Sequence, residues 1–387
     1  MQDKNILQTS VSSLFSVVDV ASAKSNRTPP LPHDGCRANV CAVNILLIKL
    51  TSLGDVIHST LALDAVKARF PQARITFVVD RSCALAVSGH PLVDRLIVAD
   101  LRAQKSQLRA FRFGAVWTEC RRVASELRQE HFDLAIDLQG AERSVLLLYL
   151  ARAAKKFCKG RYPFVTGLRR KQAHALDELR QLLALADIPA EQCFPRLALP
   201  AEAGRDLAAK LPEALRPALA SRRIVCISPF TSWVTKDVPL VTWINAAAAI
   251  HQLRPDLMFA FAATPDKKAD IEAALATAPE DLRSRLFNLA GATTVPELAR
   301  LVESSALVMA SEGATGHFAS ALGTPLVVVF GPTSPSRVGP WGRSRVVRSD
   351  TATCLECYQR RCGQWICMDG LALPISRAAL ELLGPGE

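Results

Sequence analysis

Short apolar runs alternate along the chain with longer segments whose apolar residues recur at helical spacing. Residues 45–48 form a continuous apolar run, residues 51–55 break the pattern, and residues 56–69 resume it at helical spacing. A strand that is apolar at every position is typical of a parallel sheet buried on both faces. Strand, loop and helix in this order predict the first half of a βαβ unit, where ligands bind beyond the carboxyl ends of the strands.

The same alternation continues through a first unit of the chain. We predict strands over 45–48, 74–79, 96–99 and 134–138, and helices over 56–69, around 81–88, and over 117–130, 143–156 and 173–186. Strands separated by helices of this length favour a parallel sheet with helices on both faces.

Prolines then interrupt the pattern over 195–222, and a second unit of the same kind follows. We predict its strands over 223–228, 257–262, 286–289, 306–310 and 326–330, and its helices over 241–253, 266–277, 295–304 and 315–322. The sequence therefore predicts an α/β protein of two doubly wound, Rossmann-like domains that face a central cleft. The expected divisions are a disordered leader at 1–42, a first domain at 43–200, a linker at 201–222 and a second domain at 223–387.

Length and composition agree with this organisation. The chain has 387 residues, 49% of them hydrophobic and 21% charged, as expected of a globular protein with two ordinary cores. No apolar run reaches the roughly 18–20 residues of a membrane helix. Residues 1–42 lack the basic start and apolar centre of a signal peptide. We therefore expect a cytoplasmic protein.

The net charge of +11 is concentrated in one region. Residues 102–171 contain 16 Lys and Arg against 6 Asp and Glu, whereas the rest of the chain is close to neutral. Such a region attracts anionic partners, which include nucleic acid, acidic lipid headgroups and phosphorylated glycans. The alternative is that these side chains form solvated helical faces.

The loop after the first predicted strand carries a candidate general base. Asp55 stands at the start of the predicted helix, where a carboxylate can either cap free backbone N–H groups or face a cleft as a base. His58, one turn later, has the same two interpretations, structural or catalytic. Position alone leaves both open.

This segment resembles the opening of the heptosyltransferases of glycosyltransferase family 9. The shared motif is Lys49-Leu50-Thr51-Ser52-Leu53-Gly54-Asp55-Val56-Ile57-His58, and the resemblance extends over about residues 43–370. It implies a GT-B fold, transfer of heptose from ADP-heptose to the inner core of lipopolysaccharide, and Asp55 as catalytic base. It also implies that Ser52 and Gly54 adjoin the acceptor, and that no metal cofactor is required.

A Gly-rich loop before a predicted helix is the first candidate for the donor site. Glycines allow backbone N–H groups to approach a diphosphate, and the helix dipole favours its charge; the alternative is an ordinary strand-to-helix turn. The resemblance implies donor contacts from Glu312, Gly313, Ala314, Thr315, Gly316, His317, Gly331, Pro332 and Thr333. The chain departs from the family pattern at Glu312, where relatives have Asp, and at Gly313-Ala314, so that the hydroxyl moves to Thr315.

A second candidate for the donor site follows the predicted strand 223–228. The resemblance assigns Thr231, Ser232 and Lys236 to the diphosphate, although a loop lysine is more often only solvated. Asp266, after strand 257–262, is a candidate for the ribose hydroxyl groups.

The acceptor side is predicted from a third motif and from the basic region. Residues 137–144 resemble a family motif in which Arg143 replaces Lys and keeps the positive charge. The resemblance implies an acceptor with carboxylates and phosphates. The candidate acceptor-binding residues are Gln139, Gly140, Arg143, Arg161, Arg169 and Arg170.

Four of the 11 cysteines lie close together near the end of the chain, at Cys354, Cys357, Cys362 and Cys367. Four thiolates can hold zinc, but this spacing is not that of a common finger or ribbon. A structural zinc ion, reduced thiols and a disulfide remain as alternatives.

Two other functions compete with heptosyl transfer. A transferase of the same fold could use a different nucleotide sugar, since the departures at Glu312-Gly313-Ala314 lie in the donor motif. A nucleic-acid-binding protein would explain the basic region, but such proteins usually interleave aromatic residues for base stacking. We expect ADP-heptose, an anionic lipopolysaccharide acceptor and the cytoplasmic face of the inner membrane as partners, with the protein peripheral to that membrane and no nucleic acid bound.

Overall fold

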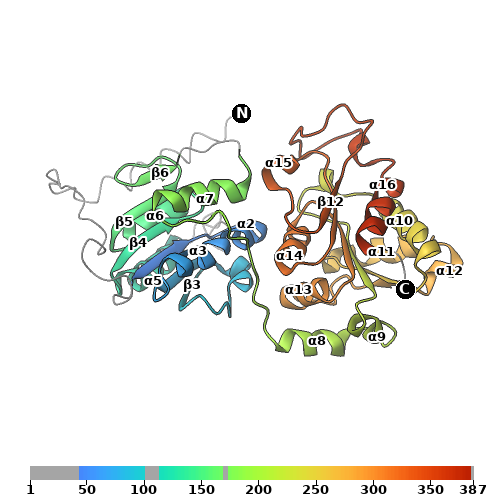
Figure 1. Ribbon diagram of the computed structural model, residues 1–387, viewed down its shortest axis with the longest axis horizontal. Helices are drawn as coiled ribbons and strands as arrows, with labels where there is room; N and C mark the ends of the chain where they lie inside the picture. The colour runs from blue at the N-terminus through green and yellow to red at the C-terminus, as the bar shows by residue number, and fades with distance from the viewer. Residues whose placement is uncertain (1–42, 101–112, 169–172, 385–387) are drawn as a thin grey trace. The chain divides into compact units, whose positions relative to one another are not determined.

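The computed structural model describes residues 43–100, 113–168 and 173–384. Within these ranges the chain forms two six-stranded sheets (Figure 1), and every strand pair is parallel. The predicted leader, as well as the candidate residues Arg169 and Arg170, lies outside the described residues.

The first sheet has the strand order β3-β2-β1-β4-β5-β6. Its strands are β1 (Asn44–Ile48), β2 (Arg74–Asp80), β3 (Arg95–Ala99), β4 (Phe132–Asp137), β5 (Ala153–Lys159) and β6 (Thr166–Leu168). Its helices are α2 (Leu53–Ser59), α3 (Leu61–Arg69), the 3-10 helix η2 (Arg81–Ala86), α5 (Phe113–Arg128), α6 (Glu142–Leu150) and α7 (Ala175–Leu185). The central strand β1 is buried along 45–48, as its apolar sequence predicts.

The second sheet has the order β12-β11-β10-β7-β8-β9, so both sheets repeat one topology. Its strands are β7 (Ile224–Ser228), β8 (Met258–Phe261), β9 (Leu286–Asn288), β10 (Leu307–Ser311), β11 (Leu326–Val329) and β12 (Ser344–Val347). Its helices are α10 (Leu240–Leu253), α11 (Lys268–Leu275), α12 (Glu280–Arg283), α13 (Val295–Glu303), α14 (Ala314–Leu322), α15 (Pro335–Val338) and α16 (Ala372–Leu383), with 3-10 helices η3 (Val234–Lys236), η4 (Pro265–Lys267) and η5 (Ile366–Met368).

The proline-rich region between the sheets is itself helical. It contains α8 (Glu202–Lys210) and α9 (Leu215–Ala220). Helix α8 packs on α13, and Lys210 Nζ lies 2.7 Å from Glu297 Oε1 across that contact. The region predicted as a linker is therefore attached to the second sheet.

Most predicted elements are present, with one error of type and several omissions. The predicted helix 143–156 ends at Leu150, and residues 153–159 form strand β5 instead, with Phe157 and Cys158 buried against β4. Strands β6 and β12 and helix α16 were not predicted. Helix α16 packs on α10 (Figure 1) and buries Ile375 and Ala379 in the second core.

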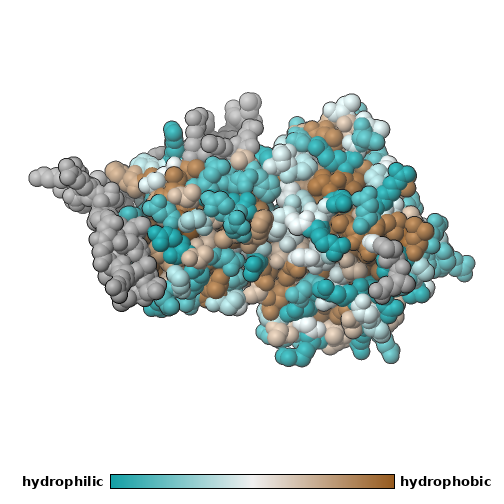
Figure 2. All heavy atoms as spheres, viewed as in Figure 1, coloured by the Kyte–Doolittle hydropathy of each residue, from teal (hydrophilic) through white to brown (hydrophobic). Residues whose placement is uncertain are grey.

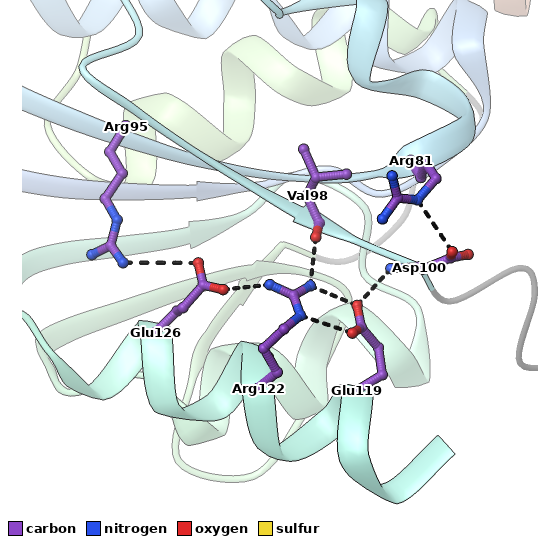
Figure 3. Close-up of polar contacts among 7 residues, drawn as sticks. All are labelled: Arg81, Arg95, Val98, Asp100, Glu119, Arg122 and Glu126. Carbon is purple, nitrogen blue, oxygen red and sulfur yellow. Dashed lines mark hydrogen bonds and ion pairs between the residues drawn. The ribbon is translucent and has the colours of Figure 1, made fainter. Parts of the chain in front are cut away.

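Helix α5 is fixed to β3 by a charged network (Figure 3). Arg122 pairs with Glu119 and Glu126 and donates to the Val98 carbonyl oxygen at 2.7 Å, while Glu126 also pairs with Arg95. Hydrogen bonding to Glu119 raises the pKa of Arg122 and lowers that of Glu119. Part of the positive charge counted over 102–171 is therefore balanced locally.

Apolar side chains on the visible face form separate patches among polar ones (Figure 2). Exposed apolar side chains include Val241 and Leu253 on α10 and Leu373 on α16. Among the helices that the structure describes, none is long and apolar enough to cross a bilayer.

Candidate active site

The loop between β1 and α2 is held by hydrogen bonds from the neighbouring strand. Gln139, which follows β4, accepts from the backbone N–H groups of Leu50 at 2.8 Å and Thr51 at 3.0 Å through its Oε1. The β1–β4 register places Ile48 beside Asp137, so both loops leave the same edge of the sheet. Gln139, predicted to bind the acceptor, thus also supports the loop that carries Asp55.

Asp55 lies in the first turn of α2 and caps it. Its Oδ2 accepts from Ser52 N at 3.1 Å and from Ser52 Oγ at 3.0 Å. Both hydrogen bonds end on one oxygen. Among the described residues, Oδ1 is therefore the oxygen that remains for an incoming hydroxyl group.

The surroundings of Asp55 keep it ionised. Burial raises the pKa of the carboxyl group, but the Lys49 ammonium, the hydrogen bonds from Ser52 and the neighbouring His58 outweigh burial, and the net pKa is lowered. Lys49 is buried at the end of β1. Asp55 is thus a carboxylate at neutral pH, as a general base requires.

The predicted donor loop of the second sheet, residues 312–317 between β10 and the first turn of α14, reaches this turn through His317. His58 Nε2 and His317 Nδ1 lie 3.2 Å apart, within hydrogen-bonding distance. A Cβ on Gly54 would lie only 2.4 Å from His317 Cδ2, so only glycine fits there. The His58 ring also packs against Trp341 with ring centroids 5.3 Å apart. Residues from both sheets therefore share one site, as the cleft prediction requires.

Both imidazoles are neutral at pH 7. Burial lowers the pKa of His58 well below its usual value, and the adjacent His317 adds to the shift. Burial likewise lowers the pKa of His317. His58 Nδ1 is buried and has no hydrogen-bond partner among the residues that the structure describes.

The donor loop after β10 brings three predicted residues together. Lys236 Nζ lies 2.9 Å from Glu312 Oε2, and Thr333 Oγ1 donates to the same oxygen at 2.9 Å. All three side chains are buried. Glu312 thus holds the end of the 231–236 loop and the turn after β11 against the start of α14.

The start of α14 offers an anion-binding surface. The helix begins at Ala314 after Gly313, and a pocket beside it is lined by Glu312, Gly313, Gly316, His317, Leu326, Val328, Phe330, Val338 and Pro340. Free N–H groups of a first helical turn attract phosphate. The buried hydroxyl of Thr315, another predicted donor-binding residue, lies 2.9 Å from Ser228 Oγ.

The loop after β7 is ordered by a residue that sequence analysis missed. Asp237 accepts from Thr231 N at 2.7 Å, and Thr231 Oγ1 donates to the Trp233 carbonyl oxygen at 2.9 Å. Ser232 is exposed between them. In the sequence, the only indication of the hydrogen bond between Thr231 and Asp237 is that the acid follows the hydroxyl residue by six positions in one loop.

Asp266 lies on η4 at the carboxyl end of β8, next to β7 in the sheet. It is fully exposed, and a hydrogen bond from Thr264 lowers its pKa. The neighbouring Lys267 Nζ stands 5.0 Å from the centre of the Phe230 ring, so this turn adjoins the 228–236 loop.

The acceptor candidates lie near the end of β4. Gly140 has a φ of +65°, and a Cβ there would lie 1.3 Å from the Lys159 carbonyl oxygen, so glycine is required. Arg143 is exposed on the first turn of α6, and Arg161 is exposed between β5 and β6. Tyr162 next to Arg161 donates to the Gly140 carbonyl oxygen at 3.2 Å, which connects the two regions.

The arrangement of the four clustered cysteines does not favour a structural zinc ion, which was one of three alternatives for them. Cys354, Cys357 and Cys362 are exposed, whereas Cys367 is buried. In the described part of the chain, which contains all four, no three His, Cys, Asp or Glu side chains are arranged to hold a metal ion.

Known proteins resemble this chain over most of its length. Residues 120–365 match the model of glycosyltransferase family 9 (heptosyltransferase). Lipopolysaccharide heptosyltransferase 1 of Pseudomonas aeruginosa is 29% identical over 339 residues, covering 83% of this chain and 87% of the relative. Lipopolysaccharide heptosyltransferase 1 of Escherichia coli K12 is 22% identical, covering 79% of this chain and 93% of the relative.

Solved structures share the fold. A family 9 glycosyltransferase from Veillonella parvula has a TM-score of 0.74 at 18% identity, covering 88% of this chain and 97% of that one. The E. coli heptosyltransferase WaaC with ADP has a TM-score of 0.68 at 20% identity, covering 88% and 100%. These likenesses confirm the predicted α/β, GT-B architecture. The family match over more than half of the chain shows that this protein belongs to glycosyltransferase family 9, the heptosyltransferases.

Proposed function

We propose that this glycosyltransferase moves heptose from ADP-heptose to the inner core of lipopolysaccharide, with inversion at the anomeric carbon. One observation carries the proposal: the Asp55 turn of the first sheet touches His317 of the donor loop in the second. A base and a diphosphate-binding helix terminus are thus adjacent. The names of the relatives supply the sugar and the acceptor.

In this mechanism Asp55 acts on the acceptor. Its Oδ1 takes the proton of an acceptor hydroxyl group while that oxygen attacks the anomeric carbon from the face opposite ADP. The bond from that carbon to the diphosphate oxygen breaks, and ADP leaves with its electrons. General-base assistance of this kind contributes roughly 10²–10⁴-fold in rate.

The second sheet stabilises the leaving group. We assign the diphosphate to the backbone N–H groups at the start of α14 and to Lys236 and Thr333, which Glu312 holds in place. Positive charge and oriented N–H groups that face a developing anion lower the barrier. Asp266, at the same edge of the sheet, is assigned to the ribose hydroxyl groups.

The first sheet receives the acceptor. We assign its anionic groups to Arg143 and Arg161, exposed near the end of β4. The positive charge of 102–171 suits a phosphorylated lipid acceptor, so we place the protein on the cytoplasmic face of the inner membrane as a peripheral protein.

The identity of the donor has an alternative, another nucleotide sugar, because Glu312 replaces the family's Asp in the donor motif. The test measures ADP release from ADP-heptose with and without a Kdo-bearing lipid A acceptor, in parallel with nucleotide release from UDP- and GDP-sugars. Acceptor-dependent release from ADP-heptose alone supports the proposal. Release from another nucleotide sugar, with none from ADP-heptose, overturns the substrate while leaving the fold.

A further inference from the structure

The cysteine-containing segment 350–370, between β12 and α16, is bound to the donor site at several points. Glu356 N donates to the Gly331 carbonyl oxygen at 2.9 Å and Tyr358 N to that of Pro332 at 2.8 Å. The turn that carries Thr333 is therefore bonded along its length to this segment.

The segment is also bonded to the loop that carries Lys236. Thr235 Oγ1 donates to the Gln359 carbonyl oxygen at 2.7 Å, and Trp365 Nε1 donates to the Thr235 carbonyl oxygen at 3.1 Å. Residues 360–364 thus lie between Gln359 and Trp365, both of which are hydrogen-bonded to Thr235.

The far end of the segment is anchored in the core. Cys367 and Met368 are buried, and a Cβ on Gly331 would lie 2.7 Å from Met368 Cε and 2.9 Å from Cys367 Sγ. This close packing leaves the segment little freedom to move away from the donor site.

Arg360 is the residue that this anchoring positions. Its guanidinium carbon lies 4.4 Å from the centre of the Trp233 ring, and Lys236 Nζ lies 5.1 Å from the same centre. Two cations from segments more than a hundred residues apart therefore adjoin one indole. Stacking on an indole orients a guanidinium while leaving its N–H edge available for an anion.

The charges at the donor site indicate why a further cation at the position of Arg360 would favour ligand binding. Lys236 is paired with Glu312, so its positive charge is already balanced before a ligand arrives. His317 is neutral at pH 7, because burial lowers its pKa. A nucleoside diphosphate adds at least two negative charges, and a further cation beside Lys236 would offset them. Arg is suited to this task, since its planar fork binds phosphate through two parallel hydrogen bonds.

We propose that Arg360 is a donor-binding residue that contacts the diphosphate of the nucleotide sugar. Segment 350–370 then lines the donor site together with α14 and the loop that carries Lys236. This inference rests on the proposed function, because it takes the diphosphate to lie between α14 and Lys236. Cys367 then helps to hold the segment in place through its packing on Gly331.

The test compares Arg360→Gln with Arg361→Gln, which changes the adjacent, equally exposed arginine of the same segment. Calorimetry measures the Kd of ADP and of adenosine for each purified protein. We expect Arg360→Gln to weaken ADP binding about tenfold or more and to leave adenosine binding unchanged, since one charged hydrogen-bonded contact is lost. Arg361→Gln should match the wild type, and Arg360→Lys should recover part of the affinity.

Two results would overturn the inference. One is an ADP affinity within twofold of the wild type in Arg360→Gln. The other is an equal loss of ADP and adenosine binding, which would mean that the substitution disturbs the segment rather than a phosphate contact. Binding of ADP is measured without acceptor or turnover, so a wrong acceptor or sugar in the proposed function would not produce either result.

Discussion

The loops that follow the fourth strand of each sheet begin with a carboxylate but use it differently. Asp137, at the end of β4, is fully buried and accepts from Gln139 N at 2.9 Å, Gly140 N at 3.1 Å and Ser144 Oγ at 2.9 Å. Glu312, just after β10, instead binds the side chains of Lys236 and Thr333 from two other loops.

We infer from this difference that the Asp137 loop supports a neighbouring loop, whereas the Glu312 loop binds the ligand. The Asp137 carboxylate is used within its own loop, which thereby places Gln139 against the Asp55 loop. We therefore propose that the reactive group of the first sheet is Asp55, in the loop after β1. In the second sheet we propose that the fourth-strand loop itself binds the ligand, because Glu312 holds Lys236, a cation that a diphosphate can share. One topology thus carries its chemistry on different loops.

The largest expected contrast is between glycines of these two loops. Gly140→Ala should lower the free energy of unfolding by about 4 kcal/mol or more, because the new Cβ meets the Lys159 backbone and the φ is positive. Gly313→Ala should cost about 1 kcal/mol or less, since its φ is −174° and its nearest neighbour is Thr231 Cγ2 at 3.5 Å. Urea unfolding of both variants measures this. Equal losses would show that the two loops do not differ in rigidity.

Breaking the Lys236–Glu312 pair should have the next largest effect. Lys236→Met leaves a buried carboxylate without its partner and should cost about 3 kcal/mol of stability, with at least tenfold weaker ADP binding. The double variant with Glu312→Leu should regain stability but not ADP affinity. Thermal unfolding and calorimetry separate the two effects.

Lys210→Met is the matched control, because it breaks the ion pair with buried Glu297 away from the donor loop. It should leave ADP binding unchanged. Normal ADP affinity in Lys236→Met would remove Lys236 from the donor site.

Acid should weaken the contact between the two sheets' loops through His58 and His317. The pKa values of both imidazoles are lowered in the folded protein. Below the unfolded pKa of about 6.5 the unfolded chain therefore binds more protons than the folded chain, and the free energy of unfolding decreases as the pH is lowered. Asp55, whose pKa is lowered below 3.8, contributes nothing in this window.

We expect the free energy of unfolding to decrease between pH 7 and pH 5, because the folded protein disfavours protonation of both imidazoles. Urea unfolding at both pH values measures it, and His58→Asn should reduce the pH dependence. The same dependence in His58→Asn and wild type would assign it to other groups.

The smallest contrast concerns two serines that bind the carboxylates of the first sheet. Ser52→Ala should cost about 1 kcal/mol, because Ser52 is exposed and water can replace its hydroxyl. Ser144→Ala should cost about 2 kcal/mol, since it leaves the buried Asp137 with one fewer partner. Thermal unfolding ranks the two, and a reversed order would mean that the Asp55 turn is the more rigid.

The alternating apolar pattern predicted both sheets because their central strands are apolar at every position. It failed at β5, where the Ala and Lys residues of Ala153–Lys159 favour a helix locally and pairing with β4 overrides that preference. Strand β12 was missed for a related reason, because Arg345 and Val346 are exposed at the edge of the sheet.

The candidate site was predictable where residues are close in sequence and where the family motif names them. The Asp55 turn and the start of α14 are examples. The pairing of Lys236 with Glu312 is not visible in a pattern, because the two lie 76 residues apart. The same applies to Arg360 against Trp233, since no local spacing indicates a contact between distant loops.

We propose that Asp55 acts as a base as well as a helix cap. The most direct test is acceptor-dependent ADP release from ADP-heptose by Asp55→Asn, with the Kd of ADP measured on the same protein and Asp64→Asn on α3 as control. We predict a loss of at least about 100-fold in kcat for Asp55→Asn, with ADP affinity and Asp64→Asn unchanged. Near-normal turnover in Asp55→Asn would contradict the claim and leave Asp55 as a cap alone.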